Sequence, residues 1–221
     1  MTFSILARDP DTGAFGGAAA TGSLCVGGWV LRGDLRAGLS ASQGVAPSTF
    51  WGEGVLQQMG TGLDAGQAVN HVISRDNGRE HRQLAALDLH GTTGAYTGAK
   101  NQDTKGSLDF TGGIAAGNML GGTEVLPAMV EAFTTADTSF AARLLGSLTA
   151  ARNAGGDYRG LLSAALLVLH PERPPLTLRI DFHEEDPIGA LRHLYQKATT
   201  GEYARWVQQV PVSTDRHRAV D

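Results

Sequence analysis

The order in which strand-like and helix-like patterns follow one another constrains the fold of this chain more than any other feature of its sequence. Apolar residues alternate with others over Thr2–Arg8, and after the turn-forming segment Asp9–Gly13 the run Ala14–Ala20 returns, which predicts a β-hairpin. The later blocks are strands, two helices, strands, two helices, strands and a helix. A parallel sheet would need strands and helices to alternate singly, so this grouping predicts an α+β fold in which helix pairs cover antiparallel sheets.

Each later element is predicted from hydrophobic periodicity and from turn or capping residues. Helical spacing of apolar residues predicts helices over Trp51–Met59, Val125–Phe133 and Phe140–Leu148, the second of them behind an N-cap at Thr123. Two more helices are predicted to begin after the N-cap Asp64 and after Asp186-Pro187. Loops are expected over Thr97–Asp109 and Gly117–Gly122. The further strands are expected at Leu24–Leu31, Ala37–Gln43, Gln83–Asp88, Gly94–Thr97, Gly112–Ala116, Ser163–Leu169 and Leu176–Phe182.

Composition indicates an ordinary soluble globular protein. Hydrophobic residues make up 42% and charged residues 18% of 221, and the formal net charge of -4 does not predict a nucleic-acid-binding surface. A single cysteine, Cys25, excludes an intramolecular disulfide framework, and we expect a cytoplasmic protein because neither a signal peptide nor a membrane-spanning stretch is evident. No linker divides the chain, so we expect one domain over residues 1–200 and a C-terminal extension or tail over 201–221.

Familiar catalytic and cofactor motifs are missing from the sequence. The seven histidines form no H-E-x-x-H or H-x-H pair, so no metal is predicted, and there is no Walker A motif, strand-linked G-x-G-x-x-G or G-x-S-x-G elbow. Cys25, flanked by Leu24 and Val26, is typical of a small core residue. Accordingly, no cofactor is expected.

An N-terminal hairpin with threonine after Met1, followed by sheets and helix pairs, looks like the four-layer αββα sandwich of the N-terminal-nucleophile (Ntn) hydrolases. More specifically, the chain resembles the bacterial family catalogued as domain of unknown function 1028, whose members are placed in that superfamily. The segments that carry the resemblance are, in order, TFSILARDPDTGAFGGAAATGS, SASQG, RQLAALDLHG, AAGNMLGG and GGDYRGLLSAALLV.

The resemblance implies that Thr2 is the nucleophile of an amide-bond hydrolase acting on a small amide or peptide-like substrate. A small residue after Met1 is what methionine removal requires, and the α-amine then released has a pKa of about 7.7 to 8.0, so it can accept the proton of its own hydroxyl. The alternative is a non-catalytic Ntn-like scaffold that binds a metabolite or partner, and in either case we expect a homodimer.

Four further residues are candidates for catalysis or substrate binding near Thr2. Asn118 and Gly117 lie where a strand gives way to a helix and can donate to an oxyanion, although an Asn there can equally serve a turn. Asp157 and Arg159 can orient the Thr2 amine or a substrate carboxylate, and the competing interpretation is an ion pair that fixes a loop.

Two polar residues are weaker candidates for substrate contact: Gln43, at the end of a predicted strand, and Ser23, on the loop after the first hairpin. The sequence also departs from the pattern that the resemblance implies. A Ser-Lys pair is expected where Thr21-Gly22 stands, and glutamine is expected at Ala116 and Leu162. At residue 22 the chain therefore lacks a cation that could tune an N-terminal nucleophile.

Overall fold

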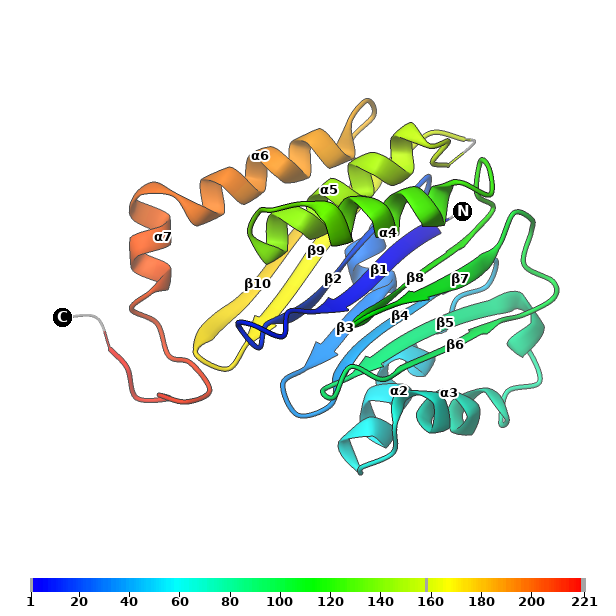
Figure 1. Cartoon of the computed structure of the whole chain (residues 1–221), viewed down its shortest axis with the longest axis horizontal. Coiled ribbons are helices and arrows are strands. Elements are labelled where there is room, and N and C mark those ends of the chain that lie inside the picture. The colour runs from blue at the N-terminus through cyan, green and yellow to red at the C-terminus, as the bar shows by residue number, and fades with distance from the viewer. Residues whose placement is uncertain (1, 158, 220–221) are drawn as a thin grey trace.

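The computed structural model describes residues 2–157 and 159–219 and has four layers, helices, sheet, sheet and helices (Figure 1). Both sheets are antiparallel throughout, so the predicted α+β class and the αββα sandwich are confirmed. The six-stranded sheet has the order β10 (Arg173–Ile180), β9 (Ser163–His170), β2 (Phe15–Thr21), β1 (Thr2–Arg8), β8 (Gly113–Asn118) and β7 (Gly106–Phe110). The four-stranded sheet has the order β3 (Leu31–Asp34), β4 (Gly38–Gly44), β5 (Arg82–Asp88) and β6 (Thr93–Thr97).

The first strand lies inside the six-stranded sheet, between β2 and β8. Its alternation sends Phe3, Ile5 and Ala7 into the core beneath the helices, whereas Leu6 packs into the core between the two sheets. Since successive side chains of a strand point to opposite faces, Thr2 and Ser4 share the inter-sheet face with Leu6. The sequence pattern therefore fixes which way the Thr2 side chain points.

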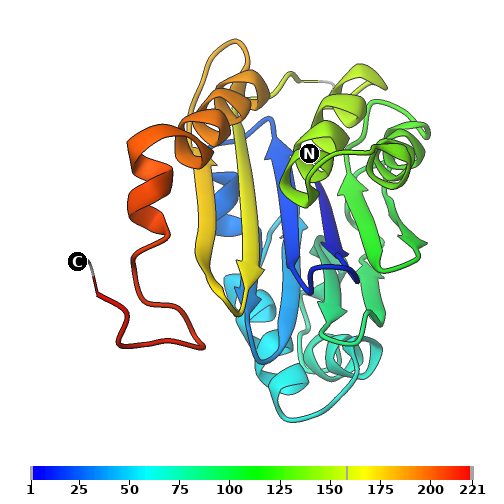
Figure 2. The same cartoon turned by 60° about the vertical axis from the view of Figure 1, so that its left-hand side comes forward.

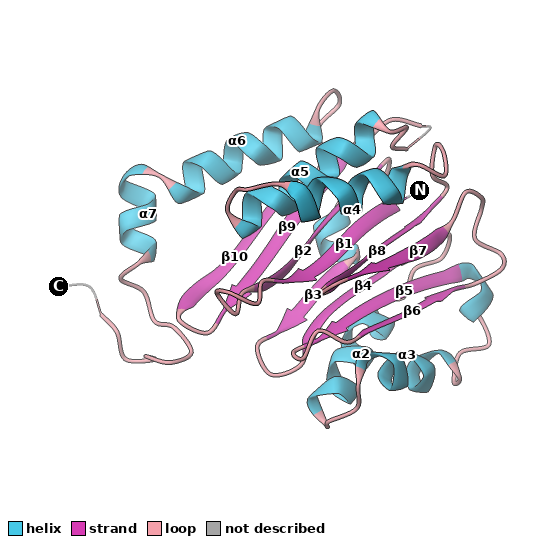
Figure 3. Ribbon diagram, viewed as in Figure 1, coloured by secondary structure: helices cyan, strands magenta, loops and turns pink. Residues whose placement is uncertain are grey.

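Helix pairs cover the outer faces of both sheets, as the ribbon shows (Figure 3). Three helices pack on the six-stranded sheet: α4 (Val125–Thr135), α5 (Phe140–Asn153) and α6 (Pro187–Thr199). The four-stranded sheet is covered by α2 (Thr49–Gly60) and α3 (Ala65–Ile73). Asp64 is the N-cap of α3 as predicted, and its carboxylate accepts a hydrogen bond from the Gln67 backbone N–H. A single-turn 3-10 helix, Arg79–His81, precedes β5.

The predicted strand Leu24–Leu31 is wrong. The segment instead forms the short helix α1 (Val26–Trp29), and β3 begins only at Leu31. Tertiary contacts override the strand propensity here, because the Ser163 hydroxyl accepts a hydrogen bond from the Val26 N–H and the Arg179 side chain packs against Gly27 so closely that a Cβ atom would not fit.

Three other expectations need correction. The expected loop Thr97–Asp109 includes most of the edge strand β7, and β8 continues to Asn118, so that the following loop begins later than predicted. Helix α4 begins at Val125 with Glu124 rather than Thr123 at the N-cap, and no side-chain hydrogen bond caps it.

The segment after α6 turns away from the six-stranded sheet, as the rotated view shows (Figure 2). It forms α7 (Gly201–Val207) and then a tail that returns to the β9–β10 turn, where the Ser213 hydroxyl donates to the Pro171 carbonyl and Val212 is buried. A domain boundary at residue 200 stays a prediction. Within the described residues, no helix has the length and apolar character needed to cross a membrane.

Candidate active site around Thr2

Thr2 begins the central strand and lies between two partners in the sheet. Its backbone pairs with Thr21 of β2 on one side and with Asn118 of β8 on the other. Residues directly opposite each other in antiparallel strands point to the same face, so the three side chains form a row toward the second sheet. The Thr2 hydroxyl donates to the Thr21 hydroxyl at 3.1 Å, and only 9% of Thr2 is exposed.

Gln83, from the facing sheet, organises the polar side chains opposite this row. It is fully buried on β5, and its Nε2 has three acceptors within 3.0 Å, the Thr97 hydroxyl and the carbonyls of Gly106 and Gly117. Because the two carbonyl oxygens can only accept, the amide of Gln83 can have only one orientation, with Nε2 toward them. Its Oε1 therefore faces the other way, toward the side-chain amides of Gln43 and Asn118.

The Oε1 atom of Gln83 accepts two hydrogen bonds, from Gln43 Nε2 at 2.8 Å and from Asn118 Nδ2 at 3.0 Å. Gln43 Nε2 also lies 3.5 Å from the Thr2 carbonyl oxygen, which ties the two sheets together beside the candidate nucleophile. We refer to Thr2, Thr21, Gln43, Gln83 and Asn118 as the inter-sheet polar cluster.

Two oxygen atoms of this cluster have no hydrogen-bond donor among the described residues. They are Gln43 Oε1 and Asn118 Oδ1, and the Ser4 hydroxyl two residues along β1 is also buried and unpaired. Flipping either amide would not help, since its nitrogen would then leave the Gln83 oxygen. Buried polar atoms in native proteins are nearly always paired, so the arrangement presents two acceptors for a donor that is not part of the described chain.

Gly117 and Asn118 lie in the last two positions of β8 rather than in the predicted loop. The Gly117 carbonyl is used by Gln83, and Asn118 is fully buried. The structure thus brings Asn118 and Gln43 together with Thr2, and Gly117 stands in register with Phe3, next to Thr2.

Asp157 lies near the same end of β1 but is engaged with the loop after β2. Its side chain is fully buried, its Oδ2 accepts from the Gly22 N–H at 2.7 Å, and its Oδ1 accepts from the Arg159 N–H at 2.8 Å. The Arg159 guanidinium adds two contacts, at 3.0 and 3.1 Å. This geometry supports the loop-fixing interpretation, and it also explains Gly22, because a Cβ atom there would overlap the Asp157 carboxylate.

Ser23, like Asp157 and Arg159, lies outside the inter-sheet polar cluster. It is exposed, and its carbonyl accepts a hydrogen bond from the Ser163 hydroxyl at 2.8 Å. Its described role is to anchor the segment that leads into α1.

The inter-sheet polar cluster consists of uncharged side chains, so it contributes hydrogen bonds rather than a local charge. The resolved pKa shifts belong to groups elsewhere. The Arg82 guanidinium beside Asp76, for example, lowers the pKa of that carboxyl. Across residues 2–157 and 159–219 no group of three or more His, Cys, Asp or Glu side chains has the arrangement of a metal site.

Sequence reasoning missed Gln83 as a site residue and gave Thr21 no role. The available signal was weak, namely a glutamine at an inward-facing position of the apolar strand Arg82–Asp88. A polar residue that alternation places on a buried face must find partners, and here the partners come from β4, β6, β7 and β8.

Solved structures that match the chain include one that covers it entirely. A Silicibacter pomeroyi protein, described as a member of family DUF1028, is 66% identical, with a TM-score of 0.97, and the match covers 100% of this chain and 96% of that one. A more distant similarity is to Thiobacillus denitrificans BPH in complex with epoxomicin, with 16% identity and a TM-score of 0.45 over 77% of this chain and 98% of that one. Another is to Anbu, the ancestral beta-subunit, from Yersinia bercovieri, with 12% identity and a TM-score of 0.40 over 92% of this chain and 97% of that one. Both are too distant to bear on function.

No curated protein matches the chain. A family model does match, over residues 2–191, and its description is family of unknown function (DUF1028). That span contains the whole inter-sheet polar cluster and both sheets. The resemblance expected from the sequence is thereby confirmed at the family level, and the chain belongs to the family of unknown function DUF1028.

Proposed function

We propose that this protein hydrolyses a C–N amide bond with Thr2 as an N-terminal nucleophile, once Met1 has been removed. The observation that carries the proposal is the placement of the Thr2 hydroxyl, 3.1 Å from the Thr21 hydroxyl and beside a buried group of amides with two unpaired oxygens. A threonine that only begins a strand would need neither a neighbouring hydroxyl nor a buried group of amides with unpaired oxygens.

The chemistry needs only the first residue of the processed chain. Thr2 Oγ1 attacks the carbonyl carbon of the amide, and its proton passes to the α-amine, whose ordinary pKa of about 7.7 to 8.0 suits a base near neutrality. The C–N bond then breaks, the leaving amine takes that proton, and a water molecule hydrolyses the ester that remains on Thr2. With Met1 in place the Thr2 nitrogen is an amide nitrogen and cannot act as the base.

The amide cluster supplies complementary groups for such a substrate. Asn118 Nδ2 carries two hydrogens, one of which bonds to Gln83, so the other can donate to the oxyanion of the tetrahedral intermediate. The unpaired oxygens of Gln43 and Asn118 can accept N–H hydrogens of the substrate. We therefore favour primary or secondary amides over amides without an N–H.

The second candidate is a scaffold that binds a ligand without turnover and works as an oligomer. One observation favours it, namely that the Thr2 hydroxyl is already hydrogen-bonded and that Thr2 is nearly buried. In this case a ligand raises the melting temperature although no product forms.

Both candidates are tested with protein whose intact mass shows that Met1 is absent. A panel of primary amides and their N,N-dimethyl counterparts is incubated with the wild type, Thr2→Ala, Thr2→Ser and the exposed control Thr135→Ala. We expect turnover of N–H amides by the wild type, the control and, more slowly, Thr2→Ser, and none by Thr2→Ala. Hydrolysis that survives Thr2→Ala would place the chemistry elsewhere.

A further inference from the structure

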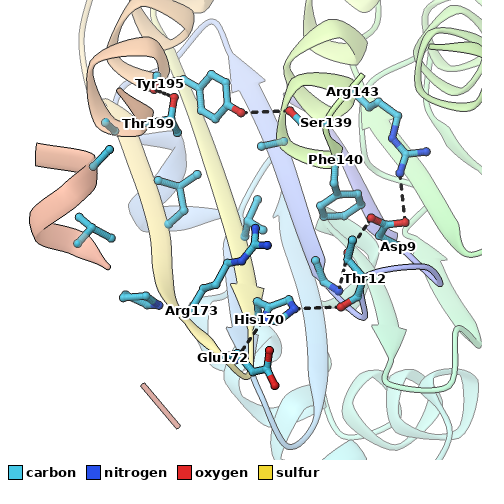
Figure 4. Close-up of a pocket in the computed structure, with 18 of the residues that line it drawn as sticks. Asp9, Thr12, Ser139, Phe140, Arg143, His170, Glu172, Arg173, Tyr195 and Thr199 are labelled. Atoms are coloured by element: carbon cyan, nitrogen blue, oxygen red, sulfur yellow. Dashed lines mark hydrogen bonds and ion pairs between the residues drawn. The ribbon is translucent and has the colours of Figure 1, made fainter. Parts of the chain in front are cut away.

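A cavity of about 940 Å³ lies at the end of the sandwich opposite Thr2 (Figure 4). Its volume is within the range of small-molecule sites, about 300–1,000 Å³. Five segments enclose it: the β1–β2 turn, the α4–α5 connection with the start of α5, the β9–β10 hairpin, α6, and α7 with the tail. None of the residues assigned to the inter-sheet polar cluster lines it.

The cavity has apolar walls that come from distant parts of the chain. Its apolar lining includes Phe140 of α5, Val168 of β9, Leu176 of β10 and Val207 of α7. Val207 lies beyond residue 191, where the match to the family model ends. The enclosure is therefore completed by a segment outside the region that the family model describes.

Two polar groups of the cavity are already committed to the protein itself. The Asp9 carboxylate accepts from the Thr12 hydroxyl at 2.7 Å and faces the Arg143 guanidinium at 3.5 Å. His170 Nδ1 accepts from the Glu172 N–H, so the ring hydrogen is on Nε2, which donates to the Thr12 carbonyl at 2.9 Å. These groups hold the hairpin turns together rather than facing a ligand.

Arg173 differs from them, because its guanidinium makes no hydrogen bond or ion pair with another described residue, and Figure 4 shows it turned into the cavity. The carboxylate of the neighbouring Glu172 points away from the centre of the cavity in the same view. Asp11 and Asp137 also line the cavity and are exposed to solvent. Arg173 is exposed as well, and it is the charged group that extends over the apolar walls of the cavity in this view.

We propose that this cavity is a binding site for an amphipathic carboxylate, an aliphatic or aromatic acid whose apolar body lies between Phe140, Leu176 and Val207. Its carboxylate pairs with the Arg173 guanidinium, whose planar fork matches the two oxygens of a carboxylate. The site is separate from Thr2, so it takes no part in amide hydrolysis and does not depend on it.

The test is a calorimetric titration of the full-length protein with decanoate, below its micelle concentration, and with decanol and decylammonium as probes that share the tail but not the charge. We expect saturable binding of decanoate and binding at least tenfold weaker for the other two. Arg173→Gln should weaken decanoate binding about tenfold. Arg75→Gln changes an exposed arginine just after α3, in the opposite helix layer, and should leave binding unchanged.

A second variant tests the location. Val207→Trp fills the cavity from a partly exposed position on α7, so the fold is retained while decanoate binding is lost. The proposal is overturned if decanoate does not bind, if decanol binds as well as decanoate, or if binding persists in Val207→Trp. Circular dichroism and the melting temperature of each variant establish that it is folded.

Discussion

The amide of Gln83 stabilises the Thr2 end of the sandwich, and replacing it with the similarly shaped methionine measures how much. In Gln83→Met, the buried nitrogens of Gln43 and Asn118 lose their common acceptor, and two backbone carbonyls lose a donor. An unpaired buried polar group costs about 1–3 kcal/mol, so the two side-chain nitrogens alone predict a loss of about 2–6 kcal/mol.

In a domain of this length, about 4 kcal/mol corresponds to a fall in melting temperature of about 8–16 °C. Urea denaturation gives the free energy of unfolding directly, and the exposed glutamine of α2 provides the control, since Gln57→Met should change it by less than about 0.5 kcal/mol. If Gln83→Met costs no more than that control, the bonds described for Gln83 do not hold the sheets together.

Three further predictions concern stability. Asp157→Ala removes the acceptor of the Gly22 and Arg159 backbone N–H groups and should cost about 2–4 kcal/mol in urea denaturation; a loss under 1 kcal/mol would contradict a loop-fixing role. Gly22→Ala forces a Cβ atom against the Asp157 carboxylate and should lower the melting temperature by several degrees, about as much as other overpacking substitutions. The pKa of Asp76 is lowered by Arg82, so this carboxylate stabilises the fold above its ordinary pKa and the effect is lost as pH falls through the lowered value. Asp76→Asn should therefore destabilise the protein at pH 7 and converge with wild type in melting scans at strongly acidic pH; a constant difference would refute the ion pair.

The layered architecture could be predicted from the sequence because each layer has its own periodicity. Alternation over Thr2–Arg8 placed the first strand, and the capping residue Asp64 placed the start of α3. Local patterns failed where tertiary contacts decide the conformation. The helix Val26–Trp29 depends on Ser163 and Arg179, which are more than a hundred residues away in the sequence.

The candidate site was predictable only in part, for the same reason. Thr2, Asn118 and Gln43 were singled out from their positions at strand ends, and the structure brings them together. Gln83 could not be found in this way, because its importance comes from the register of β5 against β4 and from the approach of the other sheet. The role of Asp157 likewise depends on its contact with Gly22, 135 residues away.

The central claim is that Thr2 becomes the first residue of the working protein. The most direct measurement is the intact mass, with fragmentation of the N-terminal peptide, of the protein purified from its native host. We predict a mass lower by one methionine residue and an N-terminal fragment beginning with Thr2-Phe3-Ser4. A protein that quantitatively retains Met1 would contradict the proposed mechanism, because the Thr2 nitrogen would then be an amide and no base would stand beside the hydroxyl.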